Sequence, residues 1–126
     1  MCFSAQADLV GGVVLGAIGI DTLRHVGQRR EYLPLAALPL MLAGHQLVEA
    51  FVWWSLQGHL SDEVTEIATW LYLLFAFVLL PVYVPAAVFA AEPPGPRRSL
   101  IRWSIVVGGI VSALLLAAML RGPVTA

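Results

Sequence analysis

Three polar residues stand close together inside a segment that is otherwise apolar enough to cross a membrane. The stretch LAGHQLVEAFVWW contains His45, Gln46 and Glu49. On an α-helix with about 100° between residues, Glu49 lies about 40° and Gln46 about 100° around the axis from His45. The three side chains therefore share one narrow arc, in which an imidazole and a carboxylate four residues apart can pair, bind a cation or pass a proton.

This polar arc is costly wherever it faces lipid, because an ionised side chain at the centre of a membrane helix costs about 2.5 to 3.5 kcal/mol on insertion scales. We therefore expect the arc to face protein or a water-filled cavity. Three interpretations stay open. The arc is an interhelical hydrogen-bond anchor, a set of ligands for a metal or cofactor with His45 as the axial ligand, or a step in a proton or ion relay.

Other patterns of reactive residues are missing from the sequence, which has no catalytic-triad spacing, zinc-protease motif, phosphate loop or dinucleotide fingerprint. A single His–Glu pair is a weak metal signal, because a transition metal takes three or four ligands. Cys2 is the one cysteine; it is either a packed small residue or, with the N-terminal amine, a ligand for a soft metal. We predict a protein that is not an enzyme, with candidate cofactor ligands at His45, Glu49 and Cys2.

The composition is that of a protein whose solvent is lipid. The chain is 60% hydrophobic and 12% charged, and its formal net charge is −1; a soluble domain carries about twice that charged fraction. All seven basic residues are arginine, and there is no excess of positive charge to attract nucleic acid. We therefore predict the lipid bilayer as a partner and exclude nucleic acid.

Four apolar segments each reach the roughly 20 residues that a membrane span needs. They cover residues 7–26, 33–56, 64–91 and 100–120, without the two-residue alternation of barrel strands. Short connections make successive helices antiparallel neighbours. We predict an all-α fold: a single transmembrane domain over residues 1–126, built as an antiparallel up-down four-helix bundle.

Arginines cluster at one end of these predicted helices. Six of the seven flank the first and third connections, whereas the opposite end has one arginine and four acids. Because cytoplasmic loops of membrane proteins are rich in arginine and lysine, we predict that both termini lie on the non-cytoplasmic side. The six arginines are Arg24, Arg29, Arg30, Arg97, Arg98 and Arg102, and the opposite end has Arg121, Asp8, Asp62, Glu63 and Glu66.

Small residues at four-residue spacing mark the faces through which the helices would pack. Gly12 and Gly16 form one such pair, and Ser104, Gly108 and Ser112 form a longer series. In lipid, helices associate where small side chains let their backbones approach. These faces serve packing within the chain, docking of another chain, or both.

Two prolines one turn apart predict a kink in the segment 64–91. Pro81 and Pro85 share a helix face, and each removes the hydrogen bond to the carbonyl four residues earlier, at Phe77 and Pro81. Tyr83 lies between the two prolines. The kink is either purely structural, or it is a hinge or a carbonyl ligand site.

The opening MCFSA and the segments LPLMLAGHQLVEAFVW and LLFAFVLLPVYVPAAVF together resemble an uncharacterised bacterial family of small multi-span membrane proteins. The resemblance implies an integral protein of the bacterial cytoplasmic (inner) membrane and implies no reaction. His45 departs from the family pattern, which has glutamine there, and family members tend to be longer. The positions that correspond to the second-helix pattern are Pro39, Leu40, His45, Gln46, Glu49, Ala50 and Trp53. The positions that the resemblance singles out are Cys2, Gln46, Glu49 and Trp53.

The expected function follows from size and polarity. Four helices with few polar groups enclose too little interior for a transport path. We therefore expect a small non-enzymatic accessory subunit that docks onto a larger membrane complex, such as a respiratory or photosynthetic one, or onto itself. The alternative is a homo-oligomeric proton or ion relay, or a metal-, haem- or pigment-binding membrane protein, that uses His45 and Glu49.

Overall fold

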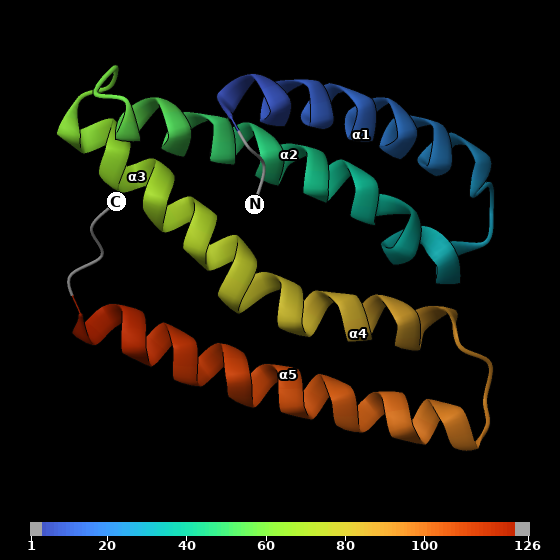
Figure 1. The fold of residues 1–126 in the computed structure, drawn as a ribbon. Coiled ribbons are helices and arrows are strands. Elements are labelled where there is room, and N and C mark those ends of the chain that lie inside the picture. The colour runs from blue at the N-terminus through green and yellow to red at the C-terminus, as the bar shows by residue number, and fades with distance from the viewer. Residues whose placement is uncertain (1–3, 123–126) are drawn as a thin grey trace.

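The computed structural model describes residues 4–122, and every regular element within that range is helical (Figure 1). The elements are α1 (Ala5–His25), the short 3₁₀ turn η1 (Arg30–Tyr32), α2 (Leu33–Leu56), α3 (Asp62–Leu73), the π-helical turn η2 (Leu74–Leu79), α4 (Leu80–Ala91) and α5 (Pro96–Arg121). Because α3, η2 and α4 follow one another without a break, they form one long helix. The described residues thus contain four helices long and apolar enough to cross a membrane.

Local sequence sets the ends of the helices. Ser4 caps α1, and its hydroxyl oxygen accepts a hydrogen bond from the backbone N–H of Ala7 at 3.3 Å. Gly27 and Gly58, which follow α1 and α2, have φ of 60° and 74°, a left-handed backbone that glycine adopts at little cost. The last helix begins at Pro96, before the predicted start at residue 100, because proline fits the first helical turn, where its missing N–H is not needed.

The helices stand in a row in chain order, each antiparallel to the next (Figure 1). α1 packs on α2, α2 packs on α3 and α4, and α5 packs on η2 and α4. The helical bundle is therefore open, with α1 and α5 as its two edges. This arrangement leaves two broad faces of the row uncovered.

Small side chains, rather than large apolar ones, fill the space between the helices. The buried apolar side chains within residues 4–122 are Ala5, Ala43, Ala50, Ala68 and Ala87. Large aliphatic side chains are exposed on every long helix, as with Val13 at 70% and Leu114 at 66%. Small residues inside and large apolar residues outside are typical of helices that associate in lipid, where burial of apolar surface gives little driving force.

Glycines bring α1 and α2 into backbone contact. A Cβ atom on Gly12 would lie 3.2 Å from an α2 side chain, and one on Gly19 would lie 2.6 Å from the backbone nitrogen of Leu40. Gly16 is looser, since its Cβ would lie 3.8 Å from the Cβ of Ala43. The face predicted from Gly12 and Gly16 therefore lies against the chain's own α2.

The second small-residue series meets the long bent helix. Gly108 sits directly on the carbonyl of Pro81, where a Cβ atom would have no room. The Ser112 hydroxyl donates a 2.9 Å hydrogen bond to the carbonyl of Val78. Ser104 is exposed, and its hydroxyl donates to a carbonyl of its own helix at 3.5 Å. Gly108 and Ser112 therefore hold α5 on η2 and α4 of the same chain.

Prolines and the π-helical turn bend the third span. Figure 1 shows its axis changing direction between α3 and α4, at the π-helical turn that precedes Pro81. Pro85 deprives the Pro81 carbonyl of its helical donor, and this is the carbonyl that Gly108 meets. The Tyr83 hydroxyl donates across to the carbonyl of Pro34 in α2, at 3.0 Å. Neighbouring helices thus contact the groups around the bend.

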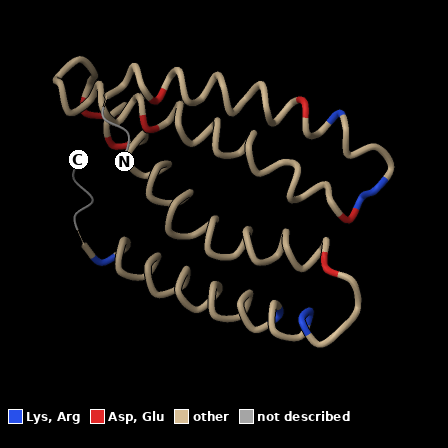
Figure 2. Tube along the Cα trace, turned by 45° about the vertical axis from the view of Figure 1, so that its right-hand side comes forward, with Lys and Arg blue, Asp and Glu red and all other residues tan. Residues whose placement is uncertain are grey.

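The two ends of the helices, where the connections lie, differ in charge (Figure 2). The α1–α2 and α4–α5 connections lie at the same end, and six arginines gather there. The opposite end carries Arg121 and the acids that begin α3, Asp62 and Glu63. The fold therefore keeps the charge asymmetry that the sequence indicates.

Candidate functional site

The polar arc of α2 faces its two neighbouring helices. The His45 ring stacks on the rings of Tyr72 and Phe75, with centroid distances of 4.7 and 4.5 Å and interplanar angles of 20° and 14°. On the other side of the arc, the side-chain oxygen of Gln46 lies against Gly11 of α1. The arc thus points into protein, as its cost in lipid requires.

Glu49, one turn beyond His45, is also buried, with 9% of its surface exposed. Since α2 and α3 are antiparallel and His45 meets Tyr72, Glu49 lies level with Thr69, which stands one turn before Tyr72. Thr69 is 7% exposed, and its hydroxyl oxygen is buried without a hydrogen-bond partner in the described chain. A buried hydroxyl of this kind costs stability unless another group supplies the hydrogen bond.

A fourth polar residue reaches the same level from α1. Gly12 packs against the α2 turn at 43–47, so Asp8, one turn before Gly12, lies level with Glu49. Asp8 is completely buried, and neither carboxylate oxygen has a hydrogen-bond partner among the described residues. We use the name polar site for the four polar residues at about this level of the helices, Asp8, His45, Glu49 and Thr69, which lie on three successive helices with α2 between α1 and α3.

The surroundings of Asp8 offset only part of the cost of burying it. Asp8 stands in the first turn of α1, where the unpaired N–H dipoles favour a negative charge by about 0.3 to 1 kcal/mol. That gain is small beside the cost of burying a carboxylate whose oxygens are both unpaired. Ala5, one turn before Asp8 on the same helix, is buried too. The polar site therefore has acceptor oxygens that no group in the described chain satisfies.

The sequence places Asp8 among the acids at one end of the helices, and this placement did not predict that its side chain is buried. Its place near a helix start is also that of an ordinary interfacial acid. A signal was nevertheless present, because Asp8, Gly12 and Gly16 follow one another at four-residue spacing and so share the face that packs on α2. Thr69 gave no signal, because a single threonine in an apolar span usually bonds its own backbone.

The polar site lacks the ligand set of a transition-metal centre. Within residues 4–122, no group of three or more His, Cys, Asp or Glu side chains could hold a metal ion, and Cys2 lies outside the described residues. The Nδ1 atom of His45 is buried without a hydrogen-bond partner in that range, and the rings of Tyr72 and Phe75 lie against the imidazole. A haem or pigment would need an open space beside His45, which this packing does not favour.

Comparison with known families covers the entire chain. A family model described as a family of unknown function, DUF6629, matches residues 1–126. The chain belongs to DUF6629. No curated protein and no solved structure matches it. The function of this DUF6629 chain is therefore inferred from its own polar site and surfaces.

Proposed function

We propose that the protein is a small, non-enzymatic integral membrane subunit that docks onto a larger complex in a bacterial cytoplasmic membrane. The observation that carries the proposal is the open row of four apolar helices with a core of alanine and glycine. Such a row buries few large side chains and leaves both of its faces available to other helices. A respiratory or photosynthetic complex is the type of assembly that we propose.

Helix length and arginine placement support insertion with both termini on the non-cytoplasmic side. The four candidate spans have 21 to 30 residues, enough for a hydrocarbon core about 30 Å thick. The end that gathers six arginines favours the cytoplasm under the positive-inside rule (Figure 2).

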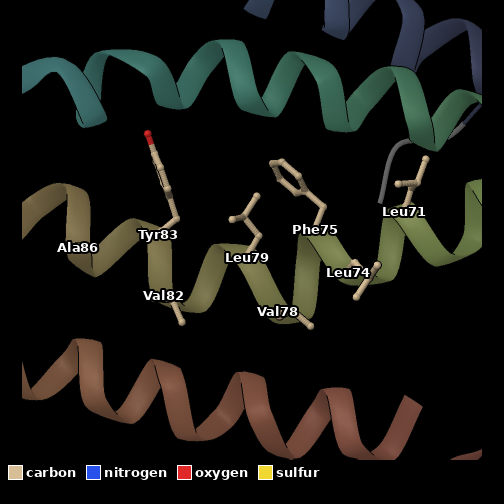
Figure 3. Close-up of a pocket in the computed structure, with 8 residues that line it drawn as sticks. All are labelled: Leu71, Leu74, Phe75, Val78, Leu79, Val82, Tyr83 and Ala86. Atoms are coloured by element: carbon tan, nitrogen blue, oxygen red, sulfur yellow. The ribbon is translucent and has the colours of Figure 1, made fainter. Parts of the chain in front are cut away.

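A long apolar groove on the third span is the surface that we assign to docking. It has a volume of about 640 Å³ and runs along α3, η2 and α4 from Leu71 to Ala86. Figure 3 shows Phe75 and Tyr83 pointing toward α2 and Val78 pointing toward α5. Sixteen residues correspond to about 24 Å of helix, so the groove offers more than four turns of contact.

The chemistry of the groove favours a transmembrane helix of a partner subunit as its occupant. Its one polar side chain, Tyr83, already donates its hydroxyl to the carbonyl of Pro34. A site for a reacting small molecule needs a few well-placed polar groups to orient it, and this lining supplies shape alone. A partner helix with small side chains on one face would pack into such a surface.

Photo-cross-linking from two leucine positions tests this docking. A photoreactive side chain replaces either Leu79, which lines the groove and is 40% exposed, or Leu114, which is 66% exposed on α5 outside the groove. In native membranes we expect one defined subunit as the main product from Leu79 and not from Leu114. Capture of the same mixture from both positions, or no capture from Leu79, would contradict the proposal.

A matched pair of tryptophan variants extends the test. Leu79→Trp fills the groove, so we expect it to release the partner during gentle extraction. Leu114→Trp adds the same bulk outside the groove, and we expect it to keep the partner. Release by both variants would point to general destabilisation rather than to the groove.

A second candidate function, ion binding at the polar site, is favoured by one observation. Asp8 is fully buried without a hydrogen-bond partner among the described residues. Ionisable residues inside membrane helices mark ion or proton sites by default. Binding of haem or pigment through His45 receives no such support, because Tyr72 and Phe75 lie against its ring.

A further inference from the structure

We propose that a cleft between α4 and α5 binds an anionic phospholipid, with an acyl chain in the cleft and the phosphate diester on Arg97. The inference rests on the membrane insertion proposed above and is independent of docking at the groove of the third span. The cleft has a volume of about 520 Å³ and shares no lining residue with that groove. We call it the α4–α5 cleft; its walls are Pro81, Val84 and Pro85 of α4 and Leu100, Trp103 and Val107 of α5.

The length of the α4–α5 cleft matches one leaflet of a bilayer. Along α5 it runs from Leu100 to Gly108, eight residues further on, which correspond to about 12 Å of helix. Half of a hydrocarbon core about 30 Å thick is about 15 Å. The deep end of the cleft lies where Gly108 meets the carbonyl of Pro81. A cleft of this length suits an acyl chain of one leaflet, whereas a partner helix crosses both leaflets.

Charge complementarity at the outer end of the cleft indicates the headgroup. Arg97 lies three residues before Leu100, so both residues share one face of α5 and Arg97 stands one turn beyond the end of the cleft. Arg97 is exposed and has no hydrogen-bond or ion-pair partner within residues 4–122. Arg98, by contrast, donates to the carbonyl of Glu92 at 3.1 Å and lies 4.4 Å from the centre of the Phe89 ring. Arg97 is therefore the arginine that is available to a phosphate.

The start of α5 also favours an anion. Its first turn contains no acid, and Gly95 offers no side chain to cap it. The helix dipole opposes positive charge at this end, so Arg97 stands where a negative group would be stabilising. A phosphate diester would neutralise Arg97 and meet unpaired N–H groups of the first turn. The helix start thus supports the choice of an anion, whereas the cleft gives the reason for an acyl chain attached to it.

Two side chains of the cleft suit the region between a phosphate and an acyl chain. The exposed Ser104 hydroxyl makes only a 3.5 Å hydrogen bond to the carbonyl of Leu100, and it can donate to an ester oxygen instead. Trp103 is exposed beside it, and tryptophan is enriched at the level of lipid headgroups. The order along α5 is arginine, then tryptophan and serine, then Val107. This order follows the phosphate, the glycerol esters and the hydrocarbon of a phospholipid.

Retention of individual lipid molecules tests the α4–α5 cleft. Delipidated protein in a neutral detergent is mixed with phosphatidylglycerol, or with phosphatidylcholine of the same acyl chains, and native mass spectrometry counts the bound lipids. We expect the first phosphatidylglycerol to bind about fivefold more tightly than the first phosphatidylcholine, the ratio that corresponds to one arginine near a lipid surface. Equal binding of the two lipids overturns the proposal.

A pair of arginine variants locates the headgroup. We expect Arg97→Gln to abolish the preference for phosphatidylglycerol. Arg102→Gln removes an exposed arginine that lies about 140° around α5 from Arg97, and we expect it to keep the preference. Loss of the preference in both variants, or in neither, overturns the assignment of the phosphate to Arg97.

A pair of tryptophan variants locates the acyl chain. Val107→Trp fills the cleft, so we expect it to lower the affinity for both lipids. Val106→Trp adds the same bulk at an exposed position of α5 outside the cleft, and we expect it to bind lipid as the wild type does. Circular dichroism shows whether both variants keep their helix content. Equal lipid binding by the two folded variants overturns the proposal.

Inorganic phosphate separates a lipid site from a site for a free anion. We expect excess inorganic phosphate at constant ionic strength to leave the bound phosphatidylglycerol in place, because it has no acyl chain to occupy the cleft. Displacement of the lipid by inorganic phosphate overturns the proposal, because the anion alone is then the ligand.

Tryptophan fluorescence gives a readout that leaves Arg97 and Val107 unchanged. In a variant that keeps Trp103 and replaces Trp53, Trp54 and Trp70 with phenylalanine, phosphatidylglycerol brominated on its acyl chains should quench the emission. We expect the quenching to saturate at a lower mole fraction of this lipid than of brominated phosphatidylcholine. Quenching that rises in the same way with both lipids overturns the proposal. Leu79→Trp, which should release the partner subunit, should leave lipid retention unchanged, so failure of the groove and failure of the cleft are distinguishable.

Discussion

Replacing Gly19 with alanine tests how closely α1 and α2 approach. A Cβ atom at this position would lie 2.6 Å from the backbone nitrogen of Leu40 and 2.8 Å from its Cα atom. Ordinary van der Waals contact begins at 3.4 Å, so the two backbones have to move apart by about 0.8 Å. The neighbouring atoms belong to backbone and cannot swing aside, which means that the helices themselves must separate.

This separation costs more than the new methyl group gains. The Thr22 hydroxyl donates a 2.9 Å hydrogen bond to the carbonyl of Ala36, and a further 0.8 Å or so would stretch it out of range. Overpacking costs about 1 to 3 kcal/mol, whereas alanine gains about 1 kcal/mol of helix propensity over glycine. We expect Gly19→Ala to lower the free energy of unfolding by about 1 kcal/mol. Gly16→Ala, whose Cβ would meet Ala43 at 3.8 Å, should raise it by up to about 1 kcal/mol.

Reversible unfolding in mixed micelles measures this difference. Far-UV circular dichroism follows the helix content of both purified variants as the fraction of denaturing detergent rises. The two glycines lie on the same helix and both face α2. The composition of the micelles therefore affects both variants alike, and it drops out of the difference between their free energies of unfolding. Equal stability of the two variants, or a gain in Gly19→Ala, would refute the backbone contact between α1 and α2.

Three further outcomes are expected. Ser112→Ala should lower the free energy of unfolding by about 0.6 kcal/mol, the average for a hydrogen bond between membrane helices, in the same micelle assay. His45→Phe should keep the stacking on the third span and stay near wild type, whereas His45→Ala should lose about 1 kcal/mol; equal losses would contradict the stacking. In a Cys2→Ser background, an impermeant maleimide added to intact cells should label His59→Cys and spare Gln28→Cys, and the reverse pattern would invert the proposed orientation.

The four spans could be predicted because each is a long apolar run that ends at polar or proline-containing residues. Runs of about 20 apolar residues give the spans, and polar or proline-containing stretches such as EPPGP separate them. The observed helix starts differ from the predicted ones where the first turn is polar, as at Pro96, because a charged turn carries no hydropathy signal. The openness of the row could not be predicted, since it depends on which helices meet, and hydropathy describes each helix alone.

Half of the polar site could be read from one helix. His45 and Glu49 stand out because charged types are rare in an apolar span, and their chemical role stays a prediction. Asp8 and Thr69 come from other helices, so their common level with Glu49 depends on how α1 and α3 are positioned along α2. Small-residue spacing predicted packing faces, but it could not tell whether another chain or the same chain covers Gly108.

The mass of the protein extracted from its own membrane tests the docking claim most directly. The chain alone has a mass of 13.6 kDa. Native mass spectrometry of polymer-extracted membranes should show this chain together with at least one different membrane polypeptide, in an assembly that Leu79→Trp dissociates and Leu114→Trp leaves whole. Species of 13.6 kDa, or of whole multiples of that mass and nothing else, would contradict the proposed role as an accessory subunit.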